Sequence, residues 1–83
     1  NKQWTVSVPG AKEMSLYFAK LETEDHYDTV EVYDGTGKLV QTLSGNNDDT
    51  YTDIISGDTA KIVLKSDNSV NTYGFDLTKI SYR

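Results

Sequence analysis

Residues 29–43 read TVEVYDGTGKLVQTL, and this stretch decides the fold. Val30 and Val32 alternate with polar neighbours, which is the two-residue period of a strand with one buried face. The letters DGTG at 34–37 supply the aspartate and glycines that tight hairpin turns favour. Because another strand-like segment follows at 38–43, the stretch predicts an antiparallel hairpin.

The same alternation recurs along the rest of the chain, with turn signals such as Pro9-Gly10 and Ser56-Gly57 between the segments. Short strands at regular spacing are typical of a β-sandwich. We therefore predict an all-β fold, an antiparallel β-sandwich of jelly-roll-like type with about seven strands. The predicted strands are residues 4–8, 14–18, 29–33, 38–43, 51–55, 60–65 and 74–82.

Residues 11–21 are the one segment that competes for a helix, because Ala, Lys, Glu, Met and Leu all favour helices. However, Met14, Leu16 and Phe18 alternate with polar or amphipathic residues. This two-residue period favours a strand.

Composition limits the function. The 83 residues suffice for one domain with a small core, and the absence of cysteine excludes disulfides and thiolate zinc sites. A domain with so small a core usually needs a further source of stability, and a bound metal or a neighbouring domain would provide it. The net charge of −5 argues against binding to a phosphate backbone. The sequence has neither a membrane-length apolar run nor a signal peptide and starts at Asn1, so we expect residues 1–83 to be one domain excised from a larger multidomain protein.

Acidic residues crowd one predicted loop. Glu22, Glu24, Asp25 and Asp28 fall within seven residues, and Asp67 lies in a polar loop far along the chain. Crowded carboxylates repel one another unless a cation neutralises them, and oxygen ligands in irregular loops suit Ca²⁺. The alternative is that these acids are simply solvated, as acidic loops commonly are.

Two blocks of sequence resemble the signature of CUB domains. Residues 16–22, LYFAKLE, and 27–35, YDTVEVYDG, resemble the family's strand ending in an acid, followed by a Tyr-Asp pair, a strand and Asp-Gly. Residues 66–69, SDNS, followed by YGF at 73–75, resemble its late block. The order and spacing match over residues 16–82. The resemblance implies a β-sandwich without catalytic activity.

The resemblance also implies a calcium site. Calcium-binding CUB domains hold the ion through three acids, which correspond here to Glu22, Asp28 and Asp67. Backbone carbonyls of the late loop complete the shell, which points to Ser69, with Val70 or Asn71 as further candidates, and water fills the remaining positions. We expect the other loop acids, including the pair at 48–49, to be solvated.

Tyr27 and Tyr73 flank the predicted calcium loops, and we expect them to form a partner-binding surface beside the ion. The expected partner is a protein ligand whose Lys or Arg meets the three acids. Animal CUB domains are longer and carry disulfides. A shortened, cysteine-free version therefore suggests a bacterial relative, secreted or at the cell surface and attached to a hydrolase. Several of the remaining tyrosines are expected to cap the edges of the core.

Three alternatives to this interaction role remain open. The first is a calcium-dependent carbohydrate-binding module with a tyrosine platform. The second is a purely structural role in which the domain stabilises an attached catalytic domain. An enzyme is the third and is not favoured. A domain this small rarely forms the deep cleft that an enzyme needs, a lone histidine in an acidic loop such as His26 is more often simply exposed, and no Gly-x-Ser-x-Gly motif occurs.

Overall fold

The computed structural model describes residues 2–23, 28–65 and 74–83, and this part of the chain contains β-strands and no helix. No helix able to span a membrane therefore occurs in these ranges. The strands are β1 (Lys2–Ser7), β2 (Glu13–Leu21), β3 (Thr29–Asp34), β4 (Leu39–Leu43), β5 (Thr50–Tyr51), β6 (Ile55–Ser56), β7 (Thr59–Lys65) and β8 (Phe75–Tyr82). The predicted all-β fold is confirmed, and residues 11–21 contribute a strand rather than a helix.

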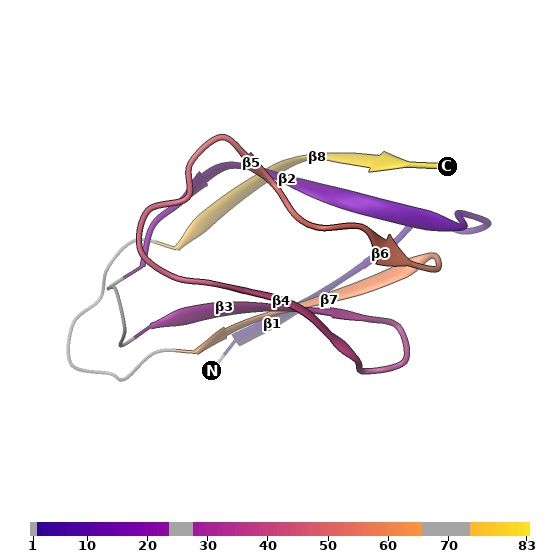
Figure 1. Cartoon of the computed structure of the whole chain (residues 1–83), viewed down its shortest axis with the longest axis horizontal. Helices are drawn as coiled ribbons and strands as arrows, with labels where there is room; N and C mark the ends of the chain where they lie inside the picture. The colour runs from indigo at the N-terminus through magenta and orange to yellow at the C-terminus, as the bar shows by residue number, and fades with distance from the viewer. Residues whose placement is uncertain (1, 24–27, 66–73) are drawn as a thin grey trace.

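The strands form two antiparallel four-stranded sheets packed face to face (Figure 1). The first sheet has the order β1-β7-β3-β4. In the second sheet, β8 pairs along nearly the whole of β2, and the short strands β5 and β6 also pair with β2. Since a strand has two edges, β5 and β6 share the edge opposite β8. The predicted antiparallel sandwich is thus confirmed.

The core lies between the two sheets and follows the alternation seen in the sequence. Phe18 and Leu16 of β2 and Val30 and Val32 of β3 are fully buried, while Tyr17 and Glu31 between them lie on the outer faces. Partly buried side chains close the core at its margins, and they are Val6, Val8, Val40, Leu64, Phe75, Leu77 and Ile80.

The predicted strand at 51–55 is wrong in one respect, because it is divided into β5 and β6. Thr52, between them, is buried and stays beside β2. Its N–H donates to the carbonyl of Leu16 at 2.8 Å, but the Leu16 N–H donates to the Thr52 hydroxyl at 3.0 Å. The side chain here takes the place of a backbone carbonyl, so the ladder is interrupted and the described residues contain eight strands.

The hairpin at 29–43 forms as predicted. The Asp34 carboxylate accepts hydrogen bonds from the N–H groups of Thr36 at 2.9 Å and Lys38 at 3.0 Å. Gly37 has φ of 92°, a left-handed conformation that glycine adopts without steric cost. Local side-chain chemistry therefore sets the register of β3 and β4.

Candidate metal centre

Two of the four predicted calcium ligands lie in the described residues, at the same end of the sandwich. Glu22 follows the last residue of β2, and Asp28 precedes the first residue of β3. The two acids therefore continue strands of different sheets. Asp28 is only 4% exposed, whereas Glu22 is half-buried.

Thr23 joins the two acidic positions. Its hydroxyl donates to the backbone carbonyl of Asp28 at 3.2 Å and accepts from the N–H of Gly45 at 2.9 Å. The Thr23 N–H also donates to the Gly45 carbonyl at 3.0 Å. This buried threonine ties the end of β2 to the start of β3. No sequence pattern predicts this role, because an isolated Thr next to an acid carries no signal of a contact five residues away.

The chain on either side of residues 66–73 lies next to both acids. Lys65 pairs with Thr29, the neighbour of Asp28 in the sequence. At the other end, the Glu22 N–H donates to the carbonyl of Gly74 at 3.0 Å. The segment that contains the late acidic loop thus leaves β7 beside one acid and enters β8 beside the other.

The other predicted site residues lie outside the described ranges. They are the ligands Asp67 and Ser69 and the partner-binding residues Tyr27 and Tyr73, so their predicted roles stay predictions. Residues 2–23, 28–65 and 74–83 contain no group of three or more His, Cys, Asp or Glu residues that could hold a metal ion. Glu22 and Asp28 are nevertheless carboxylates, the hard oxygen donors that Ca²⁺ prefers.

The expectation that the acids at 48–49 are merely solvated is incomplete. Asp48 is exposed, but its carboxylate accepts a hydrogen bond from the N–H of Leu21 at 3.0 Å. The next residue back, Asn47, donates its N–H to the Leu21 carbonyl at 2.8 Å. Asp48 and Asn47 therefore hold their loop against the last residue of β2, directly beside Glu22. An acidic pair in a polar loop gives no indication of this, because the acceptor role depends on a strand 27 residues away.

The described residues thus form a two-sheet antiparallel β-sandwich, with Glu22 and Asp28 on connections at one end. The model of the CUB domain family matches residues 1–79, and the chain belongs to this family. Comparison with curated proteins gives no match. CUB domains are protein-interaction modules, generally without catalytic activity, and they occur mainly in secreted or extracellular proteins. Many of them bind calcium.

Proposed function

We propose that this domain is a non-catalytic calcium-binding interaction module of a secreted or cell-surface protein. In this proposal Glu22, Asp28 and Asp67 bind the ion with their carboxylates, and Ser69 adds its backbone carbonyl. The observation that carries the proposal is the hydrogen bond from Thr23 to the Asp28 carbonyl, which holds two of the acids at one end of the sandwich.

Electrostatics supports a cation at this end. In this proposal the three carboxylates come from separate segments and would repel one another, and a divalent ion would remove that repulsion. The chain has no disulfide, so an ion that joins the ends of β2 and β3 to the segment between β7 and β8 would also restrain the loops. Because metal affinity is then part of folding stability, removal of the ion is expected to destabilise the domain.

The bound ion would also orient the acids toward a partner. A carboxylate that ligates calcium with one oxygen can accept a charge-assisted hydrogen bond from Lys or Arg with the other. We propose a protein ligand with an exposed basic side chain, flanked on the domain by Tyr27 and Tyr73. We further propose that the domain is attached to a hydrolase domain of a larger protein.

Calorimetric titration of Ca²⁺ into the EDTA-treated domain tests the site. The wild type should release or absorb heat, and its unfolding free energy should rise by about 2.7 kcal/mol when free Ca²⁺ is 100 times Kd. Asp28→Asn and Asp67→Asn should both abolish the heat. Asp58→Asn, an exposed acid before β7 at the other end of the sandwich, is the control with the same charge change and should bind normally.

Binding of polylysine in Ca²⁺ and in EDTA tests the partner step. Binding that requires Ca²⁺ and fails in Asp28→Asn supports the interaction role. Calcium binding without any polylysine binding would assign the ion a structural role only. No heat and no change in melting temperature in the wild type would contradict the calcium site itself.

A further inference from the structure

The outer face of the second sheet carries a row of three side chains that cross its strands. The register of β8, β2 and β5 aligns Lys79 with Tyr17 and Tyr17 with Tyr51. The two tyrosine ring centroids are 4.8 Å apart with an interplanar angle of 49°, and the Lys79 Nζ is 5.3 Å from the Tyr17 ring centroid. Tyr17 thus lies between Lys79 and Tyr51, and 52% of the Tyr51 surface is exposed.

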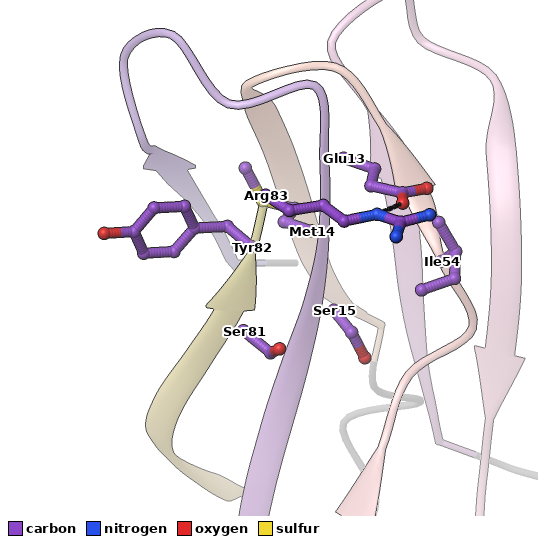
Figure 2. A pocket seen from close by; sticks show the side chains of 7 residues that line it. All are labelled: Glu13, Met14, Ser15, Ile54, Ser81, Tyr82 and Arg83. Carbon is purple, nitrogen blue, oxygen red and sulfur yellow. Dashed lines mark hydrogen bonds and ion pairs between the residues drawn. The ribbon is translucent and has the colours of Figure 1, made fainter.

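An open pocket of about 220 Å³, whose lining side chains are drawn in Figure 2, lies farther along the same strands. Ser15 and Ser81, which pair across β2 and β8, are two residues along the strands from Tyr17 and Lys79. Residues two apart share a face and lie about 7 Å from each other, so the pocket adjoins the aromatic row. Exposed Ile54 lines another part of it. The pocket is lined by Glu13, Met14, Ser15, Ile54, Ser81, Tyr82 and Arg83.

The chemistry of this face matches an uncharged polyhydroxylated ligand. The two charged lining residues, Glu13 and Arg83, form an ion pair with each other, so the pocket carries no net formal charge. Tyr51 offers an amphipathic ring, Ser81 offers a hydroxyl, and the ammonium of Lys79, the one charged group of the row, offers donors for sugar hydroxyls. A sugar ring presents an apolar C–H face together with hydroxyls, which is the complement of such a surface.

The small area that the row and the pocket cover together also favours a small ligand. Three strands about 4.8 Å apart and the rows between residues 79 and 83 give an area of roughly 200 Å². A stable protein interface buries about 800 Å² on each partner. A segment of a few sugar rings fits the smaller area.

We propose that the outer face of the second sheet binds a neutral polysaccharide, with one sugar ring on Tyr51 and the adjoining part of the chain in the pocket. This site is separate from the proposed calcium centre, because Tyr17, which pairs with Tyr51, and Glu22 are about 17 Å apart along an extended strand. Binding is therefore independent of calcium.

Affinity gel electrophoresis with xyloglucan, galactomannan or laminarin in the gel tests this proposal, with polygalacturonate as an anionic comparison. At least one neutral polysaccharide should retard the wild type equally in Ca²⁺ and in EDTA. Tyr51→Ala should weaken binding about tenfold, the equivalent of about 1.4 kcal/mol. Tyr51→Phe keeps the ring and should bind nearly as the wild type. Leu39→Ala changes an apolar residue of similar exposure on the first sheet and should have no effect.

Four results would overturn the proposal. They are no retardation on any neutral polysaccharide, retardation that Tyr51→Ala leaves unchanged, retardation on polygalacturonate alone, and retardation that EDTA removes. If no polysaccharide binds but Tyr51→Ala weakens the interaction with polylysine, the face is a protein surface instead. A domain that fails to bind calcium but still binds a neutral polysaccharide would contradict the proposed function and leave this inference standing.

Discussion

Thr52 shows how one side chain can replace part of a β-ladder. Its hydroxyl accepts from the Leu16 N–H and donates to the carbonyl of Asp53 at 3.0 Å, while its carbonyl accepts from the Ser15 hydroxyl at 2.7 Å. All three contacts lie at the point where β5 ends and the chain turns toward β6. The contacts with Ser15 and Leu16 are buried, so the Leu16 N–H and the Thr52 carbonyl depend on these partners rather than on bulk water.

Replacement of Thr52 by Val should therefore destabilise the domain by about 1–3 kcal/mol, because it leaves the buried Leu16 N–H without its acceptor. The two side chains have nearly the same shape, so the loss reports the hydroxyl rather than a cavity. Thr52→Ser keeps the hydroxyl and should cost less. Urea unfolding of the three proteins measures the difference, and equal stability of Thr52→Val and wild type would refute the role.

At the scale of elements, β3 and β7 are joined on the outer face of the first sheet by a cluster of polar side chains. The Tyr33 hydroxyl donates to the Glu31 carboxylate at 2.5 Å, and Lys65 Nζ lies 3.1 Å from the same carboxylate. The hydrogen bond from Tyr33 is the main cause that lowers the pKa of Glu31, and Lys65 lowers it further. The same contacts raise the pKa values of Tyr33 and Lys65.

A lowered pKa in the folded state predicts the direction of a pH effect. The ionised Glu31 stabilises the fold above its unfolded pKa of about 4.3, and this contribution disappears as the pH falls through the lower folded pKa. Glu31→Gln should thus lower the melting temperature at pH 7, and the gap from wild type should close toward pH 3. In a Tyr33→Phe background, which lacks the hydroxyl donor, Glu31→Gln should lower the melting temperature by less. A gap that stays constant over this range would contradict the linkage.

At the scale of the whole molecule, an aromatic chain joins the two sheets at the margin where β1 and β8 lie. Trp4 of the first sheet contacts Phe75 of the second edge-to-face, with ring centroids 4.9 Å apart. Phe75 in turn contacts the core residue Phe18 at 5.3 Å. Trp4 keeps 41% of its surface exposed, so it closes this margin only partly.

Trp4→Ala should lower the unfolding free energy by about 2 kcal/mol, less than the 3–5 kcal/mol typical of a fully buried aromatic residue. Trp4→Phe preserves an edge-to-face contact and should retain most of the stability. Thermal unfolding followed by circular dichroism suits both variants, since Trp4 is the only tryptophan of the sequence. Equal melting temperatures for Trp4→Ala and wild type would mean that the two sheets do not depend on this contact.

The architecture could be anticipated because its signals are local. The alternation of Val30 with Val32 and of Leu16 with Phe18 indicates which face of each strand is buried, and Asp34 with Gly37 specifies the turn. The order of the sequence blocks also identified the CUB family, which the family match confirms. These features depend on neighbours a few residues away, so the sequence alone was sufficient for them.

The side-chain contacts around the predicted site, by contrast, were decided only by the tertiary structure. Thr23, the residue after Glu22, is joined to the Asp28 carbonyl by its hydroxyl, and the division of residues 51–55 follows from Thr52. Several tyrosines were expected at the core edges, but strand register places Tyr17 beside Tyr51 on an outer face. Period-two alternation determines which face a side chain occupies, whereas the partner beside it is determined by how strands 30 or more residues apart pair.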